Sequence, residues 1–107
     1  MAKGSPAFDA ILISVWRQAL VEKARSIVLD GRSFPVRRTP SKNLAQVDFE
    51  FEGVNYRGLE QNRRTNSRWA QLARRGGKVM QFLEAGKYVA VVADGRITHY
   101  SRRQTES

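Results

Sequence analysis

The chain has 107 residues, 41% of them hydrophobic, with 19 lysines and arginines against 10 aspartates and glutamates, a formal net charge of +9. This length predicts one globular domain over residues 1–107, with an ordered core at about residues 5–101 and a flexible tail at 102–107. The absence of cysteine and the single histidine exclude disulfides, a thiolate nucleophile and cysteine-based zinc sites, and we expect no metal or cofactor.

An amphipathic helix is predicted at the N-terminus. Ser5 and Pro6 are typical of an N-cap and a first helical residue, and apolar residues then recur at spacings of three and four. We expect this helix to end near Arg25, with Glu22 paired to Arg25. The apolar positions are Phe8, Ile11, Leu12, Val15, Ala19 and Leu20.

The apolar run at residues 10–16 does not predict a membrane or secretion signal. Asp9 and Arg17 bracket it, and it is much shorter than the roughly 18 apolar residues of a membrane span. We therefore expect a cytoplasmic protein with no membrane partner.

Strands follow this helix. Asp30-Gly31 is a two-residue hairpin signal between residues 27–29 and 33–38, and Pro35 indicates that the second arm lies at a sheet edge. Residues 47–52 then alternate strictly between apolar and acidic side chains, and Gly53 marks a turn into residues 54–59. Either hairpin register there places Arg57 opposite an acid, Asp48 or Glu50.

A short second helix is predicted at residues 67–75, with Gly76-Gly77 ending it. Three strands then follow at about residues 79–83, 88–93 and 96–100, and Asp94-Gly95 joins the last two. The predicted fold is therefore a single α+β domain in the order helix, three strands, helix, three strands. We expect an antiparallel sheet with both helices on one face.

The segment from Arg63 to Lys78 is basic and contains no acidic residue. Trp69, Leu72 and Ala73 form an apolar seam that we expect to be core, with the basic side chains pointing outward. The basic residues are Arg63, Arg64, Arg68, Arg74, Arg75 and Lys78.

Arginines at the two ends of this predicted helix differ in their electrostatics. Arg74 and Arg75 near the C-terminus favour the helix dipole, whereas those near the N-terminus oppose it unless an anion lies between them and the free backbone N–H groups. A phosphate held by these amides, by hydroxyls and by arginines is a coherent site. The candidate anion-binding residues are Arg63, Arg64, Thr65, Ser67, Arg68, Arg75 and Lys78.

These features favour a non-catalytic basic module that binds the phosphate backbone of RNA or DNA, without reading base sequence. Arg37, Arg38 and Arg57 are outlying candidates, and the tail adds Arg102-Arg103. Two alternatives remain open at this point: a protein-interaction module that docks an acidic partner, and a basic face that is only solvated.

The aromatic residues and the histidine are predicted to have structural roles. Trp16 and Trp69 lie at helical spacing with other apolar residues and are predicted core. Tyr56, Tyr88 and Tyr100 fall on or beside strands and would stack bases only on an open sheet face. His99, across from about Ala90, is predicted to be a half-buried strand residue without a catalytic partner. These aromatic and histidine positions add no catalytic group.

The sequence has a partial resemblance to a nuclease family. The element order resembles the core of the PD-(D/E)-x-K nucleases, and Asp48 and Glu60 occupy comparable places. Asn62, however, stands where that family has its lysine. This departure makes a nuclease a remote alternative, and the sequence predicts no enzyme.

Four segments carry a second resemblance. The pattern is Y-R-G-L-E-Q-N from Tyr56, S-R-W-A-x-L-A-R from Ser67, K-V-M-Q-F from Lys78, and D-G at Asp94. It resembles a group of small uncharacterised bacterial proteins over about residues 56–100. The resemblance implies a bacterial, cytoplasmic origin and carries over no activity or catalytic residue.

Overall fold

The structure is a computed structural model that describes residues 6–62, 70–75 and 77–101. Within these residues the chain forms a helix, a π-helical turn and seven strands, with a second short helix after the fourth strand. The elements are α1 (Pro6–Trp16), η1 (Arg17–Val21), β1 (Ser26–Leu29), β2 (Arg32–Arg38), β3 (Ala45–Phe51), β4 (Val54–Glu60), α2 (Ala70–Arg74), β5 (Val79–Glu84), β6 (Lys87–Ala93) and β7 (Arg96–Tyr100).

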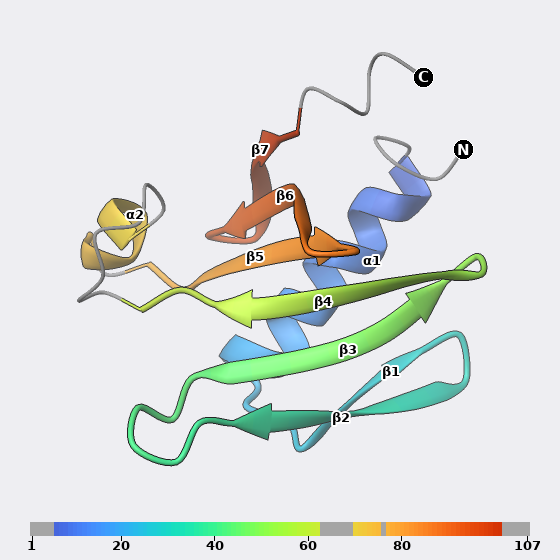
Figure 1. Ribbon diagram of the computed structural model, residues 1–107, viewed down its shortest axis with the longest axis horizontal. Helices are drawn as coiled ribbons and strands as arrows, with labels where there is room; N and C mark the ends of the chain where they lie inside the picture. Colours follow the sequence, from blue (N-terminus) through green and yellow to red (C-terminus); the bar gives the residue numbers. More distant parts are fainter. Residues whose placement is uncertain (1–5, 63–69, 76, 102–107) are drawn as a thin grey trace.

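The seven strands form one antiparallel meander, in which each strand pairs with its neighbours in sequence (Figure 1). The predicted α+β class with an antiparallel sheet is therefore confirmed in outline. The predicted order is wrong, because four strands rather than three precede α2. The strand pattern at residues 27–59 holds two hairpins, β1–β2 and β3–β4, which account for the extra strand.

Two-residue turns with positive φ at both positions connect four of the strand pairs. Asp30-Gly31, Glu52-Gly53 and Asp94-Gly95 are at or next to predicted turn positions, with φ of 50° and 79°, 52° and 79°, and 54° and 78°. The fourth turn, Ala85-Gly86, has φ of 51° and 80°. Alanine rarely adopts this left-handed conformation, so Ala85-Gly86 is not recognisable as a two-residue turn from its residue types.

Strand β2 changes its partner at Pro35. Residues 32–35 pair with β1, whereas residues 36–38 pair with β3. The prediction that this arm lies at a sheet edge is therefore wrong. Proline is tolerated because the ladder with β3 begins only at Val36, whose own N–H donates to the carbonyl of Arg25 (2.8 Å).

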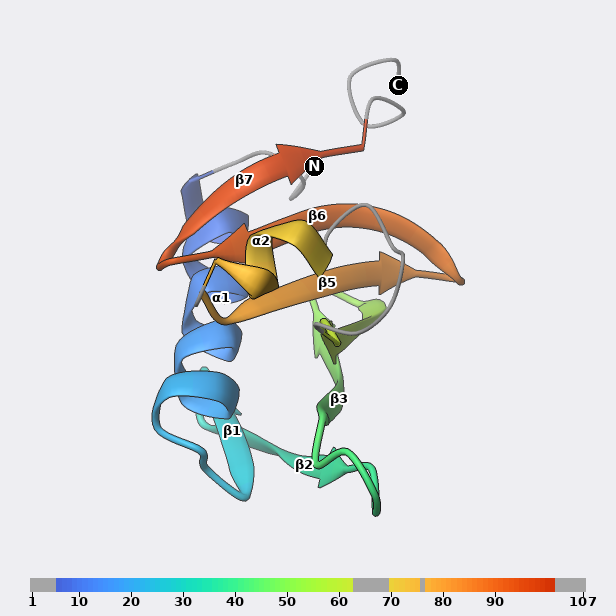
Figure 2. The same cartoon turned by 90° about the vertical axis from the view of Figure 1, so that its left-hand side faces the viewer.

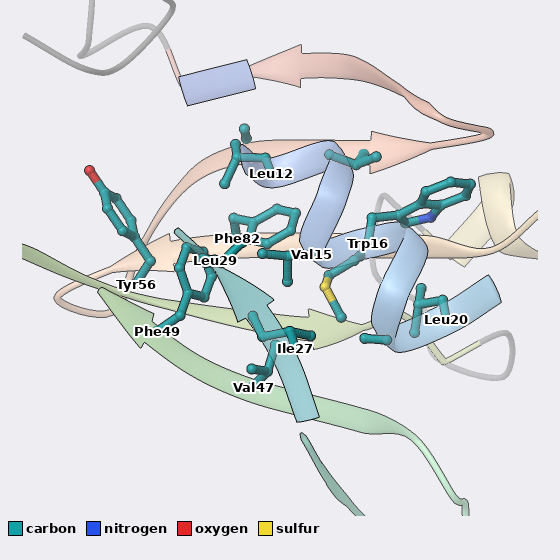
Figure 3. Packing of buried hydrophobic residues seen from close by; sticks show 14 of the residues in the cluster. Leu12, Val15, Trp16, Leu20, Ile27, Leu29, Val47, Phe49, Tyr56 and Phe82 are labelled. Carbon is teal, nitrogen blue, oxygen red and sulfur yellow. The ribbon is translucent and has the colours of Figure 1, made fainter. Parts of the chain in front are cut away.

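The main core lies between α1 and the face of the sheet that we call the inner face. Figure 3 shows side chains from α1, β1, β3, β4 and β5 converging there. The predicted apolar stripe of the helix is largely confirmed, because five of its six residues are buried and Ile11 packs against the cluster. The buried members are Phe8, Leu12, Val15, Trp16, Ala19 and Leu20 from α1 and η1, with Ile27, Val47, Phe49, Tyr56, Met80, Phe82, Ala90 and Val92 among those from the sheet.

The first helix is α-helical only as far as Trp16, so its predicted end near Arg25 is wrong. The next turn is a π-helix, closed by a hydrogen bond from the N–H of Glu22 to the carbonyl of Arg17 (2.9 Å). This wider turn brings residues five apart together, and Glu22 pairs with Arg17 (3.3 Å) instead of Arg25. Lys23, with φ of 53°, ends the helical segment.

Helix α2 lies on the other side of the sheet, which we call the outer face. Ala73 packs with Val79, Val91 and Ala93, whose side chains alternate with those of the main core along β5 and β6. Figure 2 shows α2 beside β5 and β6. The prediction that both helices share one face is therefore wrong. Side-chain alternation makes β6 apolar on both faces, so each face accepts a helix.

Two irregularities shift the register of β6. Val89 is an extra residue, because Phe82 pairs with Ala90 while Leu83 pairs with Tyr88. Thr98 is extra on β7, so His99 lies opposite Val91 rather than Ala90 as predicted. Each bulge turns the following side chains to the opposite face.

No helix in the described part of the chain is long and apolar enough to cross a bilayer.

Gly58 lies where β4 crosses the core, and a side chain there would collide with its neighbours. An added Cβ would be 2.7 Å from Sδ of Met80 and 3.1 Å from Cε1 of Phe82, and both of those residues are fully buried. We expect Gly58→Ala to lower the free energy of unfolding by about 1–3 kcal/mol, as overpacking of a dense core does. Urea denaturation measures this change.

The matched control is Asn55→Ala, which alters an exposed residue of the same strand. Its free energy of unfolding should stay within about 0.5 kcal/mol of the parent. An unchanged denaturation midpoint for Gly58→Ala would show that the core has room at this position.

Candidate functional site

Two of the seven predicted anion-binding residues lie within the described part of the chain. Arg75 and Lys78 are described, and both side chains are exposed. Arg63, Arg64, Thr65, Ser67 and Arg68 lie outside the described residues, as do Trp69 and the tail arginines at 102 and 103. The predicted helix at residues 67–75 is observed over Ala70–Arg74. The helix-end phosphate site therefore stays a prediction.

Lys78 directly precedes β5, and the backbone here makes hydrogen bonds to other segments. Its carbonyl accepts a hydrogen bond from Nε1 of the Trp16 indole (2.7 Å), and the carbonyl of Val79 accepts one from the N–H of Gln61 (2.8 Å). Buried Trp16 thus fixes the start of β5 against α1. The exposed Lys78 side chain therefore starts from a backbone that is hydrogen-bonded to α1.

A hollow of about 380 Å³ lies beside Lys78. The loop between β2 and β3, the end of β4 and the junction of α2 with β5 form its walls. It brings Lys42 to the same site as Lys78, although the two are far apart in the sequence. Its lining residues are Ser41, Lys42, Leu44, Glu60, Gln61, Asn62, Ala73, Gly77, Lys78 and Val79.

The loop that carries Lys42 has its own closing contacts. The N–H of Thr39 donates to the carbonyl of Leu44 (3.0 Å), and Oγ1 of Thr39 accepts from the N–H of Leu44 (3.1 Å). Asn43, with φ of 55°, completes the turn and donates its N–H to the carbonyl of Thr39 (2.8 Å). The exposed Lys42 is therefore presented by a structured loop. Sequence reasoning missed it because the loop shows only turn residues and a single lysine.

Glu60 is the acidic group of this hollow. Its Oε1 accepts a hydrogen bond from the N–H of Ala45 (3.0 Å), which ties the end of β4 to the start of β3. Two lysines and one carboxylate thus line the hollow, and Arg74 and Arg75 follow Ala73 on the exposed surface of α2. We call Lys42, Arg74, Arg75 and Lys78 the basic end.

The three outlying arginines have partners inside the domain. Arg57 and Arg37 both donate to the carboxylate of Asp48, at 2.6 Å and 2.8 Å, and Arg38 donates to the carbonyl of Ala19 (2.9 Å). The predicted pairing of Arg57 with an acid is confirmed, in the register that places it opposite Asp48. The two exposed ion pairs to Asp48 add little to stability, so their main effect is to reduce the net charge of the outer face.

Tyr56 does not lie on an open face. It is 3% exposed and packs against Phe8 and Phe49, with ring centroids 5.3 and 5.7 Å apart. Tyr56 is therefore core and has no room for a stacked base. Tyr100 is 38% exposed and donates its hydroxyl to Oδ1 of Asp9, which joins the end of β7 to the first turn of α1.

His99 is half-buried on β7, as predicted. Its Nδ1 lies 2.9 Å from Oγ1 of Thr98, which in turn donates to the carbonyl of Val91 (3.3 Å). The ring is thus part of the hydrogen-bonding around the β7 bulge.

The two carboxylates weighed for a nuclease do not meet. Asp48 lies on the outer face of β3 between two arginines, while Glu60 lines the hollow at the end of β4. Within the described residues, no group of three or more histidine, cysteine or acidic side chains is placed to hold a metal ion. The nuclease reading gains nothing from the geometry.

No protein-family model, curated protein or solved structure matches the chain.

Two tyrosines make the stability of the fold sensitive to alkaline pH. Burial, followed by the charges of Glu84 and Glu52, raises the pKa of Tyr56 to about 12. Burial and the hydrogen bond to Asp9 also raise the pKa of Tyr100 above its ordinary value. Because the folded state favours the neutral phenol, the stabilisation is complete below about pH 10, the ordinary tyrosine value, and is lost as the pH rises through the folded pKa.

We therefore expect the free energy of unfolding to fall between pH 10 and 12, with a smaller slope in Tyr56→Phe than in the parent. Urea denaturation at pH values across this window measures both slopes. Subtracting the two removes the contribution of lysines that titrate in the same range. Identical slopes would mean that Tyr56 ionises as readily in the folded chain as in the unfolded one.

Proposed function

We propose that this chain is a small basic module that binds the phosphate backbone of nucleic acid through its basic end. The observation that carries the proposal is the meeting of unpaired cations beside one hollow. Arg32, Arg37 and Arg57 of the sheet are paired with carboxylates, whereas Lys42, Arg75 and Lys78 form no ion pair with any described residue, and Lys42 and Lys78 line the same hollow. Uncompensated charge at one place favours a polyanionic partner there.

Paired arginines on the sheet support this choice of site. Arg37 and Arg57 share Asp48, and Arg32 pairs with Glu50 (3.2 Å). A phosphate would compete with these carboxylates for the same N–H donors. At the basic end the ammonium groups of Lys42 and Lys78 are paired with no described carboxylate.

The side chains around the hollow can contact the phosphates of a nucleic-acid backbone at its rim. Lys42 and Lys78 supply charge from two sides, and the Ser41 hydroxyl is a neutral donor. The carboxylate of Glu60 opposes an anion inside the hollow, so we place the phosphates at its rim, between the lysines and the exposed face of α2. Contacts of this kind position a nucleic acid without reading its sequence.

The sequence that precedes α2 is also basic. Arg63, Arg64 and Arg68 precede the helix, with Thr65 and Ser67 among them and no acidic residue from Arg63 to Lys78. Together with the basic end, this segment gives up to seven cations for phosphate contact. Non-specific affinity then depends on salt, since each neutralised phosphate releases counterions.

Binding of fluorescent RNA and DNA oligonucleotides, followed by anisotropy at several salt concentrations, tests the proposal. We expect affinity to fall steeply with salt, and Lys42→Gln and Lys78→Gln each to reduce the slope of log K against log salt by about 0.7–0.9. Arg64→Glu and Arg68→Glu should share a further loss.

Arg25→Gln is the matched control, because it removes an exposed cation just before β1, away from the hollow. Its slope should equal that of the parent. Absence of binding to any polynucleotide at low salt would refute the proposed function. Equal binding of poly-glutamate would instead indicate an acidic protein surface as the partner.

A further inference from the structure

A second hollow lies on the outer face of the sheet. It has a volume of about 610 Å³ and runs over β3, β4 and β5, from Phe34 on β2 to the turn at Ala85-Gly86. Arg57 lies opposite both Asp48 and Leu83, so these three side chains form a row across the strands, and Leu59 follows Arg57 on the same face. We call this hollow the sheet groove.

Two leucines in the sheet groove are partly exposed and belong to neither hydrophobic cluster. Leu59 and Leu83 lie on the solvent side of the sheet, on which alternating strands usually carry polar residues. Phe34 is also partly exposed but packs against the main core, and the rings of Phe49 and Tyr56, which border the groove too, are 2% and 3% exposed. The two leucines, with the exposed part of Phe34, offer an apolar surface to a ligand.

Charged groups in the groove are paired with one another. Asp48 is bound by Arg57 and Arg37, and Glu50 by Arg32. The guanidinium of Arg32 also lies 5.1 Å from the centre of the Phe34 ring. A phosphate entering the groove would meet Asp48 and Glu50, so the ligand group that fits there is uncharged, flat and able to stack on apolar or guanidinium surfaces.

The groove and the basic end are neighbours along β4 and β5. Leu59 lines the groove, and Glu60, the next residue of β4 but on the other face of the strand, lines the hollow beside Lys78. On β5, Leu83 and Val79 line the two sites, four residues apart, a separation of about 13 Å at roughly 3.3 Å per strand residue. Helix α2 packs over Val79 on this same outer face. One flexible polymer can therefore contact both sites.

We infer that the ligand is single-stranded nucleic acid, with its phosphates along the basic end and its bases in the sheet groove. The inference rests on the proposed function and names its substrate class. A single strand has charge on one side and unstacked bases on the other, which matches a basic rim beside an apolar groove whose charged groups are paired. A duplex keeps its bases inside the stack and presents only phosphates to such a surface, so it gains nothing from the groove.

The test compares a fluorescent single strand of about 12 nucleotides, within the range of sites that small domains bind, with a duplex of the same sequence. We expect Leu59→Ser and Leu83→Ser each to weaken single-strand binding by roughly 10-fold, the size of a lost stacking contact, and to leave duplex binding within about twofold. Gln46→Ser, an outer-face substitution directly opposite Leu59 and outside the groove lining, should change neither.

Methyl resonances of Leu59 and Leu83 in the unsubstituted protein give a second readout that does not depend on the stability of the variants. They should shift on addition of the single strand and stay in place with the duplex.

Each outcome separates the inference from the proposed function. The inference is overturned if duplex and single strand bind equally, the methyl resonances do not shift and the leucine substitutions have no effect. Phosphate binding at the basic end would then still stand. Binding of neither polynucleotide overturns both. Displacement of the single strand by poly-glutamate at the leucine methyls would assign the groove to a protein ligand and overturn the inference.

Discussion

Burial of the α1 stripe against the inner face of the sheet is the constraint on which the structure depends. Every strand pairs only with its neighbours in sequence, so the meander itself creates no contact between distant strands. The helix supplies that contact, because its apolar residues meet side chains from β1, β3, β4, β5 and β6 in one cluster. Without it the sheet would expose one apolar face, and strands alone would not hold their curvature.

Polar groups of the helical segment then fix the two ends of the sheet. The Trp16 indole donates to the carbonyl of Lys78 at the start of β5. The Gln18 side chain bonds to both the N–H and the carbonyl of Val28, 2.8 and 3.1 Å away, as a neighbouring strand would, and so covers part of the free edge of β1. Arg38 reaches the carbonyl of Ala19 from β2. Because these contacts lie on the helix side, the outer face is left to charges, α2 and the sheet groove.

The two faces of the sheet differ in how completely they are covered, and this difference explains why the candidate sites lie on one side. The inner face is filled by the core, and Gly58 shows how little space it has. The outer face carries ion pairs, a short helix over Val79, and partly exposed leucines between them. Lys42 and Lys78 complete that arrangement at the end where the β2–β3 loop meets the start of β5.

Local patterns in the sequence were enough to predict the start and apolar stripe of the first helix, the approximate strand segments and three of the turns, because periodicity and turn residues act over a few positions. The pairing of Arg57 with an acid was also predictable, since it depends on one hairpin. Only the tertiary structure decided the outer position of α2, the π turn after Trp16, the register of His99 and the meeting of Lys42 with Lys78. Each of these depends on packing between segments distant in the sequence, where a bulge such as that at Val89 changes which face a residue occupies.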